Sequence, residues 1–572
     1  MPLRPLRLGL VAGAVIIIVV FGTYGYNYDP VNYLIMLFAV LPLYAAFRVS
    51  RTIRRKGRVE ALEKMWGSKG DPGRKRENVE LLHELLLERG DEPIVDDVTW
   101  TDLGFDEVFA RIDQTRSTPG RTTLYSALRR PLLESDRIEN RAAVIERLGE
   151  DRGLRFAVFD AATTLGEQKG HDVVRLLWGS PDTSANLLPL AVAMFSAAIL
   201  SIVLVFVVGP GAIIFPAVPV FLSNAILHTV LRRRFEHRVE SVSYLRRMIS
   251  AARRLVGQNG IGDVAPQLGK ATARVAGVYR RTGFVLGKRP DPSDILDVAV
   301  EYINALFLLE VLGYYASRSA IENRKSDLKV LFRSIGELDA LLSAASFRET
   351  YGVRCVPEFT EGTRILADGI VHPLLPKPVA NSIDLGRPGI VLTGSNMSGK
   401  STLLRAIGLN QILAQSIVAC AAQSYRTTVF RVVSSISKRD DLAAGKSSYL
   451  TEAERIHDVI RFSAQSPPLL AIIDEVLSGT NTVERVRAAI AILRYLAERN
   501  AITIAATHDL EIAQTMTDSY TLLHLADDVN DDGITFDYTL KAGIVSTRNA
   551  IRLLEHLGYP KEILEDAKKN GR

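Results

Sequence analysis

The chain has 572 residues, of which 47% are apolar and 23% charged, and its formal net charge is +6. This length is too great for one hydrophobic core, so we expect three or more structural units. The apolar content and the slightly positive mean hydropathy are unusual for a soluble enzyme and direct attention to membrane segments. The two cysteines, Cys355 and Cys420, have no metal-type spacing, and we interpret them as small buried apolar residues in a reducing compartment.

Four apolar runs are arranged as two hairpins. Each run is 17 to 22 residues long, near the length that crosses the hydrocarbon layer of a membrane. The runs cover Leu8–Tyr24, Val31–Phe47, Leu187–Val208 and Ile213–Leu231. We predict two transmembrane hairpins, with a signal peptide or buried core helices as the alternatives.

Basic residues flank the outer ends of these hairpins. Arg4 and Arg7 precede the first run, and clusters at 48–58 and 232–238 follow the second and fourth, whereas both turns lack Lys and Arg. The positive-inside rule then predicts a multi-pass membrane protein whose termini and large segments are all cytoplasmic. The basic clusters are thereby explained as topology signals and lipid contacts, which weakens a nucleic-acid interpretation.

The remaining chain divides by pattern into helical and mixed parts. After the first hairpin (1–47) we expect a basic connector (48–100) with an amphipathic helix at 79–89, and then a helical segment (101–185). The second hairpin (186–231) is followed by further helices (232–350). From 351 to 572, strands and helices alternate, which predicts a parallel α/β domain.

A phosphate-binding loop follows the apolar run 390–392. Its Gly-Ser-Asn-Met-Ser-Gly-Lys-Ser-Thr sequence lies between a predicted strand and a predicted helix. Glycines permit turns that direct backbone N–H groups at phosphate oxygens, the lysine reaches the β- and γ-phosphates, and the serine after it ligates Mg²⁺. We therefore predict that ATP and Mg²⁺ bind at Gly394, Ser395, Asn396, Met397, Ser398, Gly399, Lys400, Ser401 and Thr402.

Two carboxylates follow a second buried strand, at Asp474 and Glu475. The carboxyl ends of parallel strands are where ligands bind in open α/β sheets. Asp474 is predicted to hold Mg²⁺ through a water molecule, and Glu475 to polarise the attacking water as a general base.

Three further polar residues are candidates for the same site. His508 follows the apolar strand 502–506 and is predicted to stabilise the γ-phosphate, although a surface histidine at a strand end is the simpler alternative. Gln415 lies one helix after the phosphate loop and is predicted to touch the metal or the water. Ser447 precedes a helix start that could bind the phosphate of a neighbouring subunit, or merely cap the helix.

In this order the motifs resemble the MutS DNA mismatch-repair family. TGSNMSGKSTLLR (393–405) is similar to that family's phosphate loop, and its other ATPase motifs resemble DDLAAGKSSYLTEAE (440–454), IIDEVLSGTNTVE (472–484) and ATHDLE (506–511). VHPLL (371–375) resembles its His-Pro strand, and 538–569 its closing segment, which packs subunits together. Segments 112–132 and 332–347 resemble the start and end of its core domain.

The resemblance implies a P-loop ATPase of the MutS type that carries an all-α core and lever domain. Asn396, Lys400, Ser401 and Thr402 then contact phosphate and metal, and His508 contacts the γ-phosphate. Ser447 corresponds to a serine offered to the partner's nucleotide, which implies a homodimer with two composite sites. The family's mismatch-reading domain has no counterpart, and the second apolar hairpin replaces its DNA clamp.

Three functions follow as hypotheses. The first is a membrane-anchored ATPase dimer in which closure of the two ATPase domains moves the lever helices and the hairpins. The second is a membrane-tethered sensor of DNA mismatches or junctions, favoured by the positive charge and by the resemblance. The third is an ABC-type transporter component, which is disfavoured because no Leu-Ser-Gly-Gly-Gln sequence precedes Leu469.

Overall fold

The computed structural model describes residues 3–27, 36–71, 73–74, 79–86, 94–168, 170, 172–179, 187–208, 217–284, 303–350, 355–395, 398–436, 448–477, 482–530, 533–544 and 558–569. The chain forms two compact units, Met1–Ser68 and Lys69–Arg572. The boundaries predicted at 101, 186, 232 and 351 all fall inside the second unit and stay predictions.

The first unit consists of two long helices and a short 3-10 turn. They are α1 (Leu3–Asn27), η1 (Met36–Ala39) and α3 (Val40–Met65), and α1 packs along α3. Helix α3 joins an apolar N-terminal half to a strongly basic second half within one continuous helix. The predicted second span therefore extends without a break into the predicted connector.

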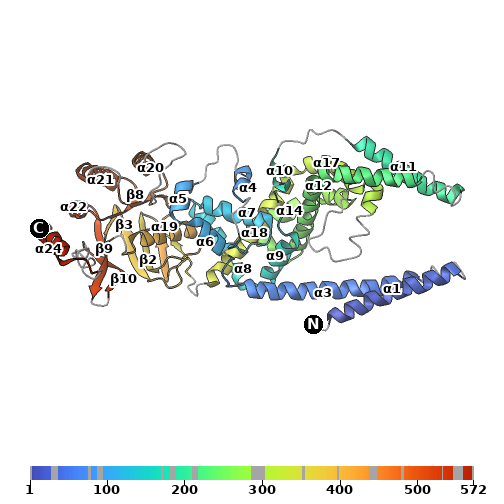
Figure 1. Cartoon of the computed structure of the whole chain (residues 1–572), viewed down its shortest axis with the longest axis horizontal. Coiled ribbons are helices and arrows are strands. Elements are labelled where there is room, and N and C mark those ends of the chain that lie inside the picture. Colours follow the sequence, from blue (N-terminus) through green and yellow to red (C-terminus); the bar gives the residue numbers. More distant parts are fainter. Residues whose placement is uncertain are drawn as a thin grey trace. The chain divides into compact units, whose positions relative to one another are not determined.

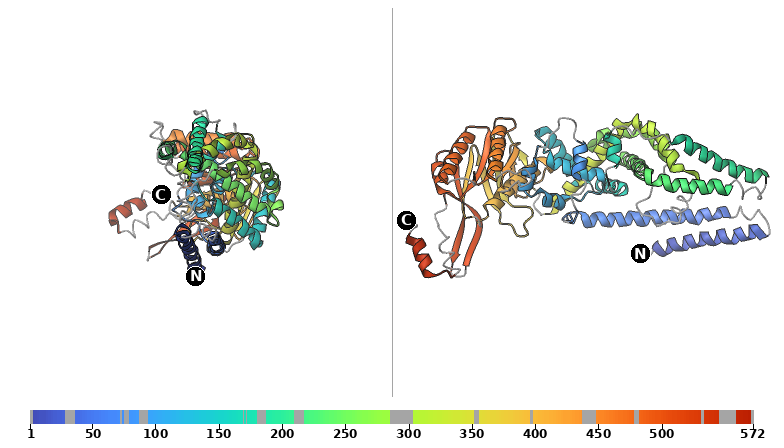
Figure 2. Two further views of the ribbon diagram at one scale, coloured as in Figure 1. Left: turned by 90° about the vertical axis from the view of Figure 1, so that its right-hand side faces the viewer. Right: turned by 45° about the horizontal axis from the view of Figure 1, so that its top comes forward.

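Helices make up the N-terminal part of the second unit. The first group is α4 (Val79–Leu86), α5 (Asp97–Asp102), α6 (Phe105–Ile112), α7 (Thr118–Arg129), α8 (Ser135–Glu150), α9 (Arg152–Leu165) and α10 (Asp172–Trp178). The second group is α11 (Leu188–Val208), α12 (Ala217–Val256), α13 (Ile261–Val264), α14 (Pro266–Arg274), α15 (Ala276–Arg281), η3 (Thr282–Phe284), α17 (Leu309–Glu322) and α18 (Lys325–Thr350). Within this unit, α6 to α9 lie between the sheets and the outer helices α11 and α12 (Figures 1 and 2).

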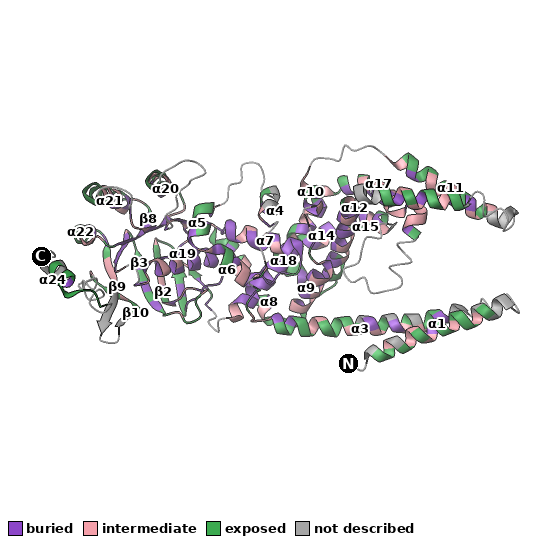
Figure 3. Ribbon diagram, viewed as in Figure 1, coloured by how far each residue is buried: buried purple, intermediate pink, exposed green. Residues whose placement is uncertain are grey.

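No helix within the described ranges combines the length and the apolarity that crossing a bilayer requires. The prediction of four membrane spans is therefore not supported by the structure. The fourth predicted span illustrates the difference, because its described part belongs to α12, a single helix of 40 residues that continues into the basic sequence. Exposed residues are nevertheless frequent on α1, α3 and α11 (Figure 3).

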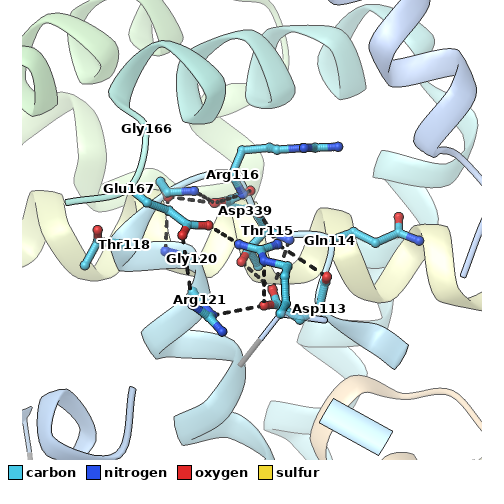
Figure 4. Close-up of polar contacts among 12 residues, drawn as sticks. Asp113, Gln114, Thr115, Arg116, Thr118, Gly120, Arg121, Gly166, Glu167 and Asp339 are labelled. Atoms are coloured by element: carbon cyan, nitrogen blue, oxygen red, sulfur yellow. Dashed lines mark hydrogen bonds and ion pairs between the residues drawn. The ribbon is translucent and has the colours of Figure 1, made fainter. Parts of the chain in front are cut away.

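The two segments predicted to begin and end the core domain pack together through α7 and α18. Asp339 of α18 accepts hydrogen bonds from the backbone N–H groups of Arg116 (3.1 Å) and Ser117 (2.9 Å) and from the Ser117 hydroxyl (2.6 Å) (Figure 4). Burial raises the pKa of Asp339 to about 7. Gly120 completes the fit, since a Cβ there would lie 2.0 Å from the Asp339 carboxylate.

Asp113 forms a second polar centre beside the first. Its carboxylate is fully buried and lies 3.1 Å from Nε of Arg121 and 3.4 Å from Nε of Arg74 (Figure 4). Burial of a charge is tolerated where it is paired in this way. The loop between α6 and α7 is thus held by the Asp339 carboxylate of α18 and by the ion pairs of its own Asp113.

The C-terminal part contains two sheets. Their strands are β1 (Glu358–Phe359), β2 (Arg364–Ile370), β3 (Asn381–Gly386), β4 (Gly389–Thr393), β5 (Ser424–Thr427), β6 (Arg431–Ser435), β7 (Leu469–Asp474), β8 (Ala501–Thr507), β9 (Thr521–Asn530) and β10 (Gly533–Ala542). The helices are α19 (Lys400–Ile417), α20 (Ser448–Ser463), α21 (Thr482–Ala497), α22 (Leu510–Thr515) and α24 (Lys561–Lys569). This agrees with the predicted α/β domain.

The larger sheet has the order β10-β9-β4-β8-β7-β6, and all neighbouring strands are parallel except β9 and β10. Ala471 and Ile473 pack on one face with residues of α20, α21 and α22. Ile472 points to the other face and reaches Gly408 of α19. Helices therefore cover both faces, which explains why β4, β7 and β8 are almost wholly apolar. The smaller sheet has the order β1-β5-β2-β3. Its strand β3 is followed in the chain by β4 of the larger sheet, and these two strands are in contact.

Candidate nucleotide site

The phosphate loop connects β4 to α19, as predicted. Gly394 has φ +150°, and a Cβ there would lie 2.6 Å from the Ser398 hydroxyl and 2.7 Å from the carbonyl of Leu525. Gly399 has φ +95° and precedes the first residue of α19. Only glycine fits both positions without strain. The loop leads directly into the N-terminus of α19, an 18-residue helix, and such a terminus favours a bound anion.

Lys400 is buried under this loop. Its ammonium group donates hydrogen bonds to the carbonyls of Gly394 and Ser395, each at 2.7 Å. The Ser398 hydroxyl also donates to the Ser395 carbonyl, at 2.8 Å. The hydroxyl oxygen of Ser395 is buried and has no hydrogen-bond partner among the residues that the structure describes. An orphaned hydroxyl and a buried ammonium in one loop fit a bound anion with several oxygens.

The predicted metal ligands lie side by side. The Ser401 hydroxyl, in the first turn of α19, donates to Oδ2 of Asp474 at 2.5 Å. Asp474 is the last residue of β7, and it pairs with Ala506 of β8. Mg²⁺ prefers oxygen ligands and commonly takes one or two carboxylates together with substrate phosphates. The Ser401 hydroxyl and the Asp474 carboxylate fit that set of donors.

Glu475 and His508 form the third part of the site. Nδ1 of His508 lies 2.8 Å from Oε1 of Glu475, and Glu475 is largely buried. Glu475 has φ +62°, a conformation that is rare for a residue with a side chain and is often found at functional sites. Its backbone N–H donates to the carbonyl of Ala506 at 2.9 Å, which holds the turn after β7 against β8.

The sheet register explains why these residues meet. Thr393, at the end of β4, is opposite Thr507 at the end of β8, and β8 is in turn paired with β7. The carboxyl ends of three adjacent parallel strands therefore lie at one edge, which delivers the phosphate loop, the two carboxylates and His508 to the same place. Thr402 follows Ser401 on α19.

The other predicted residues lie elsewhere or outside the described ranges. Asn396, Met397 and Ser447 fall on residues that the structure does not describe. Gln415 lies 15 residues after Lys400, near the far end of α19, which is about 22 Å along a helix. The structure therefore does not bring Gln415 to the metal position.

Gln415 instead joins the helical part to the sheet. Its amide nitrogen donates to the carbonyls of Leu132 (3.1 Å) and Phe430 (3.0 Å), and its amide oxygen accepts from the N–H of Phe430 (3.1 Å). His372, predicted on a strand, lies in the turn after β2. Burial and the neighbouring Arg405 lower the pKa of His372 to about 4.

Tyr538 was not predicted as a site residue. Its ring lies 3.0 Å from the position of a Cβ on Gly399, and it sits at an irregularity in the pairing of β9 with β10. Asn381 holds this bulge through the carbonyl of Tyr538 (3.0 Å) and the N–H of Leu540 (2.7 Å). Bulges frequently re-aim a side chain next to an active site, and Tyr538 thereby places an aromatic ring against the loop.

A polar junction behind the site was also not predicted. Oδ2 of Asp102 accepts hydrogen bonds from the Ser434 hydroxyl (2.8 Å) and the N–H of Ile436 (2.9 Å), and its carbonyl accepts from Arg405 of α19 (2.8 Å). Arg455 of α20 donates to Asp96 through two bonds of 3.0 and 3.1 Å. These contacts tie α5 to the helices on either side of the sheet.

Comparison with known proteins identifies this domain. Residues 390–572 match the family model of MutS domain V. This match assigns residues 390–572 to MutS domain V. The match begins in β4 and includes the phosphate loop, both carboxylates and His508, so the MutS assignment rests on the residues whose geometry is described above.

The chain is also similar to MutS proteins from several organisms. It is 30% identical over 259 residues to the DNA mismatch repair protein MutS of Thermus thermophilus, which is 45% of this chain and 31% of that protein. It is 29% identical over 256 residues to that of Thermus aquaticus (44% and 31%), and 27% identical over 277 residues to the DNA mismatch repair protein MutS 2 of Halobacterium salinarum (46% and 31%). The chain thus spans about a third of the length of these curated relatives.

Proposed function

We propose that the chain is a MutS-type ATPase that binds and hydrolyses ATP with Mg²⁺. The observation that carries the proposal is the convergence of the Ser401–Asp474 pair and the Glu475–His508 pair beside a phosphate loop. A strand-end carboxylate with a hydroxyl ligand and a separate base is the arrangement that phosphoryl transfer to water requires.

Each residue has a distinct part in this chemistry. Lys400 exchanges the carbonyls of Gly394 and Ser395 for the oxygens of the β- and γ-phosphates. Glu475 polarises the attacking water, and its hydrogen bond to His508 fixes the orientation of the carboxylate. Ser401 and Asp474 would hold Mg²⁺, which would supply positive charge to neutralise the phosphate oxygens.

Steady-state hydrolysis of ATP by the purified full chain tests the proposal. Glu475→Gln should retain ATP binding and lower kcat by about 10²-fold or more, because a positioned base contributes that much. Lys400→Ala should lose ATP binding. Arg487→Gln, on the exposed face of α21, is the control and should keep the wild-type rate. A chain that hydrolyses no ATP, or whose rate is the same in all three variants, refutes the assignment.

We further propose that the active form is a homodimer in which Ser447 of one subunit completes the site of the other. The support is the resemblance of 440–454 to the corresponding MutS motif. Mixing two inactive variants tests this point, since a heterodimer of Ser447→Ala and Lys400→Ala contains one site with both residues intact. Recovery of activity on mixing is expected, and two variants that stay inactive when mixed contradict a shared site.

DNA binding is a second candidate function. It is favoured by the names of the relatives, which are DNA mismatch repair proteins, and by the net charge of +6. Affinity for homoduplex, mismatched and branched DNA, measured at several salt concentrations, tests it, because phosphate contacts make binding strongly salt-dependent. Equal affinity for all three DNA forms contradicts a sensor of mismatches or junctions.

We also propose that α1 and α11 associate with a lipid surface and that the protein lies on the cytoplasmic side of a membrane. Large apolar side chains are exposed on both helices, among them Ile16 (61% exposed), Val19 (57%) and Leu200 (58%). Water contact with such surface is unfavourable by about 25 cal/mol per Å². Flotation of the full chain with phosphatidylcholine vesicles is expected, and a chain that stays at the bottom of the gradient contradicts the proposal.

A further inference from the structure

A cavity of about 760 Å³ opens in the helical part of the second unit. Residues of α14, α15 and α17 line it together with the turn after α17, and α15 and α17 lie side by side (Figure 3). Its lining residues are Arg274, Gly277, Val278, Arg280, Arg281, Ala320, Asn323 and Arg324. Four are arginines and none is acidic, so the cavity is a concentrated positive site that the ATPase chemistry does not use.

The positive charge of the cavity is only partly balanced. Arg274 and Arg324 share one carboxylate, that of Asp327, at 3.3 and 3.5 Å. Within the described residues, the side chains of Arg280 and Arg281 make no ion pair or hydrogen bond. Asp327 thus balances two of the four guanidinium groups, and the excess positive charge favours an anion that brings more than one negative charge.

Two more arginines surround the same helix. Arg246 and Arg253 of α12 stack on the ring of Tyr279, with guanidinium carbons 4.6 and 4.9 Å from the ring centre. The side chain of Arg246 also donates to the carbonyl of Tyr279 at 3.1 Å. Both groups are thus fixed against α15, and they add to the positive potential at the cavity without occupying it.

The chemistry of the lining selects the class of ligand. Guanidinium groups bind phosphate through paired, planar hydrogen bonds, and several of them together match a group with three or four oxygens. A volume of 760 Å³ falls in the range of about 300–1,000 Å³ that is typical of small-molecule sites, well above what a bare inorganic ion fills. Val278 and Ala320 give the cavity an apolar portion, which suits an organic body attached to the phosphate.

We propose that this cavity binds a phosphate ester, carried either by a small soluble molecule or by the headgroup of a phospholipid. Arg280 and Arg281 contact the phosphate, because, of the four arginines that line the cavity, these two make no ion pair or hydrogen bond within the described residues. Arg274, at the end of α14, and Arg324, in the turn after α17, complete the site. Asn323 adds an amide that can donate to a phosphate oxygen or to a hydroxyl of the organic body.

Binding by the full chain, with Mg-ADP present to occupy the phosphate loop, tests this inference. The soluble probe is inositol hexakisphosphate, followed by calorimetry. The lipid probe is a phosphatidylcholine vesicle with or without phosphatidylinositol phosphate, followed by flotation. Binding of the soluble probe assigns a soluble ester, and a requirement for the charged lipid assigns a headgroup.

The matched variants decide whether the cavity is responsible. Arg280→Gln with Arg281→Gln removes two charges from the cavity, and Arg487→Gln with Arg494→Gln removes two from the exposed face of α21. The first pair should weaken binding by about tenfold or more, since it removes charge-assisted hydrogen bonds, and the second by less than about twofold. Equal loss in both pairs overturns the proposal. So does cavity-dependent binding of duplex DNA when neither phosphate ester binds.

Discussion

The contact between α20 and α5 allows a quantitative test. Arg455 is almost buried, with 10% of its side chain exposed, and it donates to the Ser434 carbonyl (2.6 Å), the Thr99 hydroxyl (2.7 Å) and both oxygens of Asp96. Arg455→Met keeps the apolar stem and removes every one of these bonds. Asp96 retains only its cap of the Thr99 N–H at 2.8 Å.

The expected loss of stability depends on the Asp96 carboxylate, which remains without its ion-pair partner after the substitution. Removing one partner of a fully buried ion pair costs about 3–5 kcal/mol. The Asp96 side chain is 34% exposed, so water solvates part of the remaining carboxylate, and we expect a smaller loss of about 2–3 kcal/mol. Adding Asp96→Asn to Arg455→Met should lower the free energy of unfolding little further, because the partner of Asp96 is already gone. The double variant should therefore lose less than the sum of the two single variants, which corresponds to a coupling energy of about 1–3 kcal/mol.

Urea denaturation followed by tryptophan fluorescence measures these changes. Trp100 reports on the junction directly, because its ring stacks on Phe105 with centroids 4.9 Å apart. Arg461→Met is the control, since Arg461 lies on the same helix but is 58% exposed and makes a surface ion pair with Asp458. The reasoning is refuted if Arg455→Met shifts the free energy of unfolding by no more than this control, or if the effects of Arg455→Met and Asp96→Asn simply add.

Three other predictions follow from single contacts. Gly120→Ala should destabilise the fold by about 1–3 kcal/mol in the same urea assay, because its Cβ would lie 2.0 Å from the Asp339 carboxylate. The pKa of Asp339 is about 7 in the folded protein and near 3.8 in the unfolded chain, so folding favours the protonated form. The free energy of unfolding should therefore fall as the pH rises from about 4 to 7 and then level off. Asp339→Asn should flatten this dependence on pH. Tyr538→Ala should weaken ATP binding by about 1–3 kcal/mol in a titration with a fluorescent nucleotide if its ring stacks on the base, and unchanged affinity rules out that contact.

The phosphate site was largely predictable from local sequence. A loop between a strand and a helix fixes where Lys400 and Ser401 lie, and a carboxylate after a buried strand belongs at the same edge of a parallel sheet. The structure confirms the strand–loop–helix order and the proximity of Asp474, Glu475 and His508. The sequence could not show that Lys400 bonds to loop carbonyls, because this depends on the path of the loop itself.

Gln415 shows where such reasoning fails. Its place on the first helix after the loop suggested proximity to the site, but position along a helix translates into distance at about 1.5 Å per residue. The amide nitrogen of Gln415 instead donates hydrogen bonds to the backbone carbonyls of Leu132 and Phe430. A buried glutamine must satisfy its hydrogen bonds somewhere, and the sequence alone did not specify a partner 283 residues away at Leu132.

The helical part was predictable as helices but not in its polar contacts. The pairing of the 112–132 and 332–347 segments agrees with their resemblance to the two ends of one core domain. That Asp339 would cap the loop at Arg116 and Ser117, with Gly120 fitted beneath it, depends on a contact across more than 200 residues. No local pattern specifies such a contact, because Ser117 alone indicates an ordinary helix cap and Asp339 alone indicates an ordinary residue within a helix.

The junction at α5 constrains how the ATPase and helical parts can move. Arg405 belongs to α19, which begins at the phosphate loop, and it bonds to the carbonyl of Asp102. Arg455 belongs to α20, which begins next to Ser447, and it bonds to Asp96 at the other end of α5. A shift of α20 relative to α19 must therefore either reorient α5 between them or break at least one of these two contacts. Because breaking the Arg455–Asp96 contact costs about 2–3 kcal/mol, reorientation of α5 as a rigid piece is the less costly response.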